Sequence, residues 1–97
     1  MLQSRAGLGR EETNKSMNLL KLLERHPDSF EFRHPVDFIG LGLPDYPEII
    51  KVPMDLSTVK QNMKLGEYQS MQDFLLDLQL IWDNCKLYNP EESVIPI

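Results

Sequence analysis

The chain has 97 residues, the size of one domain, and its 41% hydrophobic content suffices for a single core while excluding a larger enzyme scaffold. The net charge of -5 and the lack of any run of Lys or Arg argue against direct binding to a nucleic-acid backbone and favour a basic partner. The single cysteine, Cys85, cannot form an internal disulfide, and no apolar stretch approaches the ~20 residues that span a bilayer. Because no secretory leader pattern opens the chain, we expect a soluble protein of a reducing intracellular compartment.

The beginning of the chain predicts a leader followed by a helix. Residues 1–14 are polar and show no steady period, so a flexible leader is predicted there. A helix is predicted from Lys15, with Thr13 or Ser16 as its N-cap and Pro27 just past its end. Its apolar residues recur at helical spacing and are Met17, Leu19, Leu20, Leu22 and Leu23.

Two further helices are predicted in the second half of the chain. The first opens at Asp55, whose carboxylate can cap the first turn, and closes at Gly66, a residue typical of helix ends. Its predicted buried stripe is Leu56, Val59 and Met63. The second opens on Ser70 with Asp73 three residues later, close to a capping box. Its predicted buried face is Met71, Phe74, Leu75, Leu78, Trp82 and Cys85.

The connection from Pro27 to Met54 is far longer than the ~2 to 8 residues usual between bundle helices, and such loops are usually functional or disordered. Its high apolar content predicts that it packs on the helices instead of extending into water. Within it, Asp45 to Lys51 is expected to form a short helical turn, with Pro47 in the first turn, where proline is tolerated. No segment alternates with period two for long enough to suggest a sheet, so an all-α fold is predicted.

The chain resembles bromodomains in two strings, PVDFIGLGLPDYPEIIKVPMDLSTVKQNMKLGEY and DFLLDLQLIWDNCKLYNPEES. The resemblance implies an all-α, left-handed four-helix bundle over residues 15–97, after a leader at 1–14. It also implies binding of N-acetyl-lysine, usually on histone tails, between the long loop and the loop after the third helix. In the family the asparagine of the YN pair, here Asn89, hydrogen-bonds the acetyl carbonyl. The tyrosine of the PDY triplet, here Tyr46, holds a water that bridges to the same carbonyl.

The resemblance implies the remaining residues of the acetyl-lysine pocket as well. Val36, Leu41 and Leu43 match positions that line its walls, and Phe32 matches its floor. A gatekeeper side chain at the mouth is expected from the first turn of the last helix, for which Ile95 is the candidate. The full set of predicted acetyl-lysine-binding residues is Asn89, Tyr46, Phe32, Val36, Leu41, Leu43, Cys85, Tyr88 and Ile95.

Each of these residues also has a structural interpretation. Asn89 fits a plain helix C-cap, and Tyr46 and Tyr88 fit core aromatics whose hydroxyls find a backbone partner. The apolar loop residues fit a role in attaching the loop to the bundle. Cys85 lies on the helical stripe and is expected in the core, one turn before Asn89. Val94 is the next candidate for the gatekeeper, because the loop length leaves the register open.

The chemistry of the residues agrees with the implied ligand. Acetylation removes the lysine charge and leaves a secondary amide, which suits an apolar pocket with one oriented donor. Burying the ammonium of an unmodified lysine there costs several kcal/mol with no carboxylate to offset it. Pro90 pushes Asn89 out of the helical region, so the helix is expected to end there. One neutral hydrogen bond nets only ~0.5 to 1.5 kcal/mol, so micromolar-range affinity for a single mark is predicted.

Two features depart from the family pattern. The aromatic-proline-phenylalanine segment beside the family's pocket reads Phe30, Glu31, Phe32 here. The charge at the rim either favours a basic residue next to the mark or is only solvated. The chain reaches Ile97, eight residues past Asn89, which allows at most about 12 Å of helix. The family's last helix is therefore expected to be largely missing, and a shortened sequence, disorder or another chain over the bundle stay open as explanations.

The function classes can be ranked from these patterns. An enzyme is disfavoured, because no nucleophile-base pair, paired carboxylates or phosphate-binding glycine loop is present, and no cofactor is expected. His26 and His34 lack metal-ligand spacing, so no metal site is predicted. The expected partners are acetylated lysine peptides of histone tails, without direct nucleic-acid or membrane binding, for a nuclear module of a larger chromatin protein or complex. The alternative is a helical interaction domain whose binding ignores acetylation and survives Asn89→Ala.

Overall fold

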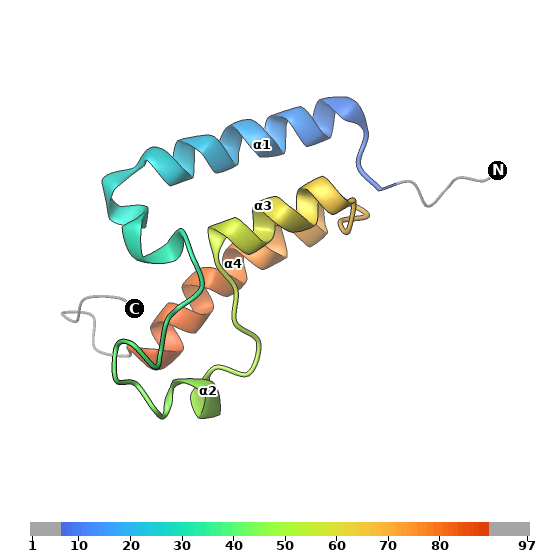
Figure 1. Cartoon of the computed structure of the whole chain (residues 1–97). Helices are drawn as coiled ribbons and strands as arrows, with labels where there is room; N and C mark the ends of the chain where they lie inside the picture. The colour runs from blue at the N-terminus through green and yellow to red at the C-terminus, as the bar shows by residue number, and fades with distance from the viewer. Residues whose placement is uncertain (1–6, 90–97) are drawn as a thin grey trace.

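The computed structural model describes residues 7–89, and this part of the chain is helical with no strand. The predicted all-α class is therefore confirmed. The sequence LSTVKQNMKL forms one long helix and the segment after Ser70 forms another, as their apolar spacing and caps require. In chain order the elements are α1 (Arg10–Arg25), the 3-10 helix η1 (Pro27–Phe32), α2 (Tyr46–Ile49), α3 (Leu56–Leu65) and α4 (Met71–Tyr88), as shown in Figure 1.

The start of α1 corrects two predictions. The helix begins at Arg10 with Gly9 as its N-cap, so residues 10–14 belong to it and not to a flexible leader. Ser16, one of the predicted N-caps, instead lies inside the helix, where its hydroxyl donates to the Glu12 carbonyl oxygen at 2.8 Å. Polar contacts stabilise this first turn, so its sequence lacks the apolar spacing that predicts a helix. The Gly9 amide donates to the Glu12 carboxylate at 3.3 Å. An ion pair of 3.6 Å joins Glu11 to Lys15 one turn apart.

The ends of α3 and the start of α4 confirm the predicted caps. The Asp55 carboxylate accepts hydrogen bonds from the amides of Ser57 at 2.9 Å and Thr58 at 3.2 Å. These bonds satisfy amides that have no partner inside the helix. Gly66 ends α3 at φ 74°, in the left-handed region that glycine adopts without strain. The Ser70 hydroxyl accepts from the Asp73 amide at 3.3 Å and opens α4.

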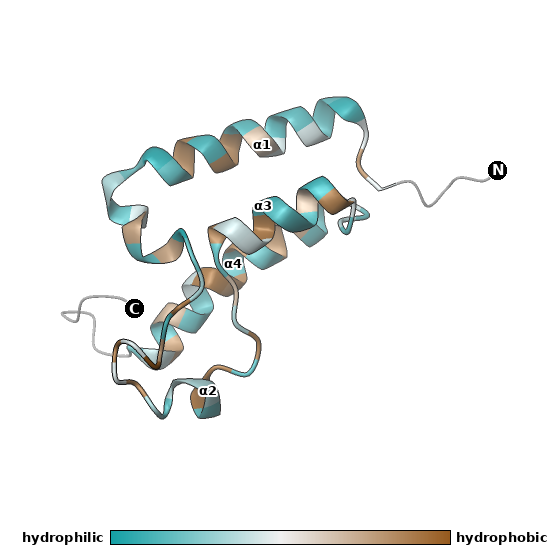
Figure 2. Cartoon of the chain, viewed as in Figure 1, coloured by the Kyte–Doolittle hydropathy of each residue, from teal (hydrophilic) through white to brown (hydrophobic). Residues whose placement is uncertain are grey.

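The core lies where α1, α3 and α4 pack together. Figure 1 shows α3 between α1 and α4, and Figure 2 shows hydrophobic residues recurring along all three helices. The predicted stripe of α3 is confirmed, but that of α4 needs correction: Leu75 is 47% exposed, whereas Ile81, which was not predicted, is 2% exposed. Ile81 follows Leu78 and Phe74 at the three-to-four-residue spacing of one helix face, and Leu75 falls beside that face. The buried core is Leu20, Leu56, Val59, Met63, Tyr68, Phe74, Leu78 and Ile81.

The long loop packs against the carboxyl-terminal half of α4, as its apolar content predicted. Its predicted helical turn is α2, with Pro47 in the first turn. Tyr46 and Ile50 are buried at 5% and 2% exposure, while Ile39 at the tip of the loop is 82% exposed. The expected last helix falls on residues 90–97, which lie outside the described part of the chain. The fold thus brings the long loop to the end of α4 where Asn89 follows.

Candidate functional site

Aromatic rings join the long loop to the last turn of α4. The ring of Tyr46 meets that of Tyr88 edge-on, with centroids 4.9 Å apart at 64°, and lies nearly parallel to Phe38 at 6.2 Å. The Tyr88 hydroxyl donates to the Asp45 carboxylate at 2.7 Å. Edge-on and offset pairs of this kind are favourable beyond the area they bury. The loop is therefore fixed to the helix beside Asn89.

Asn89 ends α4 in the manner of a helix cap. Its backbone amide donates to the Cys85 carbonyl oxygen at 2.8 Å, and its side-chain Nδ2 donates to the same oxygen at 3.2 Å. Its φ and ψ of -121° and 74° are not helical, as the following proline requires. The prediction that the helix ends at Asn89 is confirmed. An amide NH2 carries two hydrogens, so capping Cys85 leaves a second N–H that can donate to a ligand.

A second contact, missed at the sequence level, fastens the loop further along α4. Asn84 is 9% exposed, and its Nδ2 donates to the Val52 carbonyl oxygen at 2.8 Å. The Val52 carbonyl lies outside any helix, so this side-chain bond supplies the hydrogen-bond donor that a helix would otherwise provide. The signal was present, because Asn84 follows Ile81 by three residues and so continues the buried face of α4. A polar residue in phase with a buried face indicates such a hydrogen bond.

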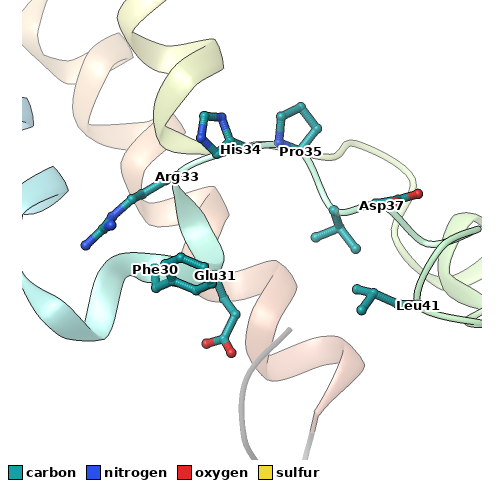
Figure 3. Close-up of a pocket in the computed structure, with 8 residues that line it drawn as sticks. Phe30, Glu31, Arg33, His34, Pro35, Asp37 and Leu41 are labelled. Atoms are coloured by element: carbon teal, nitrogen blue, oxygen red, sulfur yellow. The ribbon is translucent and has the colours of Figure 1, made fainter.

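One of the described cavities lies between η1 and the long loop (Figure 3), with a volume of about 380 Å³. We call it the loop cavity. It contains two of the predicted wall residues, Val36 and Leu41. Figures 1 and 3 both place the carboxyl-terminal end of α4 next to the loop that carries them. Its lining residues are Phe30, Glu31, Arg33, His34, Pro35, Val36, Asp37 and Leu41.

The other predicted pocket residues are spread over neighbouring hollows. Tyr46 and Val36 together line a cavity of about 300 Å³ on the side of the loop that faces α2. Leu43 lines a separate hollow at the loop tip. Phe32 lies against the Trp82 ring, edge-on at 4.9 Å, in a hollow between η1 and α4. Val36 therefore shares one hollow with Leu41 and another with Tyr46, whereas Leu43 and Phe32 each line a different hollow.

The remaining site residues are distributed as follows. Three predicted site residues at the end of α4 line none of these four cavities, namely Cys85, Tyr88 and Asn89. Cys85 is half-buried and is not part of a disulfide. Ile95 and Val94, the gatekeeper candidates, lie outside the described residues. The composition of the predicted pocket therefore stays a prediction.

The tyrosines at the site are held in their protonated form. Burial raises the pKa of Tyr46, and the nearby Cys85 raises it further. The hydrogen bond to Asp45, followed by desolvation, raises the pKa of Tyr88 to about 12. At neutral pH both hydroxyls therefore remain neutral and able to donate.

Residues 7–89 contain neither a cluster of metal-binding side chains nor a helix that could span a membrane. No group of three or more His, Cys, Asp or Glu side chains in this range could hold a metal ion. Within the same range, no helix combines the length and the apolar character needed to cross a membrane.

Comparison with known proteins places this arrangement in context. The family model described as Bromodomain matches residues 16–97. The chain is 44% identical over 79 residues to a bromodomain-containing protein of Schizosaccharomyces pombe, and the match covers 81% of the chain and 11% of that protein. It is 45% identical over 78 residues to transcription factor GTE7 of Arabidopsis thaliana, covering 80% of the chain and 13% of the relative. With the SWR1 complex bromodomain subunit of S. pombe it shares 37% identity over 90 residues, covering 93% and 16%. The chain thus spans less than a fifth of the length of these relatives.

Proposed function

Because this chain belongs to the bromodomain family, we propose that it is a non-catalytic module that binds N-acetyl-lysine on histone tails or other chromatin-associated proteins. The observation that carries the proposal is the meeting of the long loop with the end of α4, through the Tyr46–Tyr88 and Tyr88–Asp45 contacts. Val36 and Leu41 of this loop offer apolar side chains to a ligand, and Asn89 after α4 offers an amide donor.

The proposed recognition rests on charge and on one hydrogen bond. An acetylated lysine ends in a neutral amide, which loses little on entering an apolar recess, whereas a charged ammonium loses several kcal/mol. The second N–H of Asn89 donates to the acetyl carbonyl while the first keeps its bond to Cys85. Tyr46 holds a bridging water at the same carbonyl. Ile95 serves as gatekeeper, and residues 15–97 make up the binding domain.

The cellular setting is proposed from the relatives. One relative is named as a transcription factor and another as a bromodomain subunit of the SWR1 complex. We infer that this module acts in the nucleus, as part of a longer chromatin protein. Its partners are acetylated lysine peptides, with no direct contact to nucleic acid or membrane and no cofactor.

The test is a calorimetric titration of matched peptides, acetylated and unmodified, into the wild-type chain, Asn89→Ala and Asn18→Ala. Asn18 is an exposed asparagine of α1 and serves as the control for loss of an amide. We expect micromolar-range binding of the acetylated peptide alone, retained in Asn18→Ala and reduced at least about ten-fold in Asn89→Ala. Circular dichroism checks that each variant is folded, since Asn89→Ala also removes a helix cap.

A second candidate function has its own observation. Several leucines on the helices are exposed, among them Leu22 at 61% and Leu76 at 56%. A partner that binds this apolar surface would bind equally with or without acetylation and would tolerate Asn89→Ala. The same titration therefore separates the two functions.

A further inference from the structure

One carboxylate of the loop cavity, that of Glu31, has no partner among the described residues. Glu31 stands in the cavity wall together with Val36 and Leu41. Its side chain is exposed, and in the described part of the chain no hydrogen bond or ion pair engages it. A carboxylate in this position can form an ion pair with a cationic ligand side chain without first breaking another interaction.

The one arginine in the same wall does not neutralise this charge by direct contact. The Arg33 side chain donates to the Ser29 hydroxyl at 3.1 Å and to the His26 carbonyl oxygen at 3.0 Å. Its guanidinium also lies over the Phe30 ring, 5.6 Å from the centroid. Figure 3 shows Arg33 directed away from Leu41 and Glu31 extending away from Arg33. The guanidinium is thus engaged by Ser29, His26 and Phe30, and no ion pair joins it to Glu31.

The remaining charged group of the cavity is already used in a turn. The Asp37 carboxylate accepts a hydrogen bond from the Gly40 amide at 2.9 Å, which closes the loop. Asp37 adds negative potential to the cavity, but its carboxylate already accepts this hydrogen bond within the loop. Glu31 is therefore the group of the wall best able to pair with a ligand side chain.

We propose that Glu31 is a specificity-determining residue, which favours acetylated peptides that carry an arginine or lysine within about two or three residues of the mark. The proposal rests on the proposed function, because it takes the acetyl-lysine to enter between η1 and the loop. A cavity of about 380 Å³ is about 9 Å across if spherical, and an extended peptide advances ~3.3 to 3.6 Å per residue. A residue two or three positions from the acetyl-lysine can therefore reach the mouth of the loop cavity. The net charge of -5 assists the approach of such a cationic ligand.

The test uses short glycine-serine peptides with a single acetyl-lysine, flanked at two positions by either arginine or serine. They are titrated into the wild-type chain, Glu31→Gln, Glu31→Lys and Glu67→Gln. Glu67 is an exposed glutamate between α3 and α4, at the other end of the α3 helix from the loop, and controls for the loss of net charge. Exposed ion pairs of this kind change affinity by about two- to five-fold.

We expect the arginine peptide to bind wild type and Glu67→Gln about two- to five-fold more tightly than the serine peptide. The ratio should fall to about one in Glu31→Gln and below one in Glu31→Lys. A ratio unchanged by either Glu31 substitution overturns the inference while leaving acetyl-lysine binding intact. Loss of acetyl dependence for the serine peptide in wild type, by contrast, overturns the proposed function itself.

Discussion

At the residue scale, the side chain of Asn89 has a structural and a proposed functional role. Its Nδ2 caps α4 through the Cys85 carbonyl, as a C-cap asparagine does. The cap fixes the rotation of the side-chain amide at the helix end. A donor whose orientation is already set loses less entropy when a ligand carbonyl arrives. The capping and binding roles are thus compatible, since they use different hydrogens of the same group.

The hydroxyl of Tyr88 makes stability at high pH a test of the loop attachment. Its pKa, about 12 in the folded chain, exceeds the ~10 of an unfolded tyrosine, so the folded state holds this proton more tightly. The stabilisation is complete below about pH 10 and is lost as the pH rises through about 12. We expect Tyr88→Phe to lose less unfolding free energy than wild type between about pH 10 and about pH 12, measured by urea unfolding.

Other tyrosines do not obscure this comparison. Burial also raises the pKa of Tyr46 and of Tyr68, but both residues are present in wild type and in Tyr88→Phe. They contribute an alkaline loss to both proteins. Equal losses in the two proteins would show that the Tyr88–Asp45 bond does not form in solution.

At the element scale, the positions of the helices were largely predictable from the sequence. Which of their residues are buried was less predictable. The boundaries of α3 came from Asp55 and Gly66, since a cap residue acts through its own neighbouring amides and carbonyls. The predicted start of α1 was wrong, because the first turn of the helix is stabilised by polar contacts such as the hydrogen bond between Gly9 and Glu12. The exposure of Leu75 depends on how α4 rotates against its neighbours, which periodicity fixes only to within one residue position.

The candidate site was predictable in part for the same reason. The end of α4 at Asn89 follows from the local rule for a residue before proline. The distribution of Val36, Leu43 and Phe32 over different hollows depends on the path of the long loop. That path is set by non-local contacts, such as the bond from Asn84 to Val52, and local patterns do not encode them.

The contact between Asn84 and Val52 gives a test of how the loop is held. In Asn84→Ala the Val52 carbonyl oxygen loses a part-buried hydrogen bond, which lowers the free energy of unfolding by about 0.5–1.5 kcal/mol. We also expect faster amide hydrogen exchange in residues 46–54, because the loop loses a fixed point on α4. Gln72→Ala, an exposed substitution on the same helix, serves as the control. Unchanged stability and exchange in Asn84→Ala would mean that the aromatic contacts alone hold the loop.

At the scale of the whole molecule, the core and the proposed site lie in different places. The buried core joins α1, α3 and α4, whereas the loop meets the carboxyl-terminal end of α4 outside that core (Figure 1). Substitutions of exposed site residues such as Glu31 can therefore change binding with little effect on folding. The same separation allows loop sequences to differ without rebuilding the bundle.

The most direct test of acetyl-lysine recognition is an NMR titration that follows the side-chain amide of Asn89. Matched serine-flanked peptides, acetylated and unmodified, are added to the labelled chain. We expect the acetylated peptide to shift the Asn89 amide resonances together with those of the Val36 and Leu41 methyl groups, and the unmodified peptide to leave all three unshifted. Equal shifts from both peptides, or shifts confined to exposed leucines such as Leu22 and Leu76, would contradict this expectation.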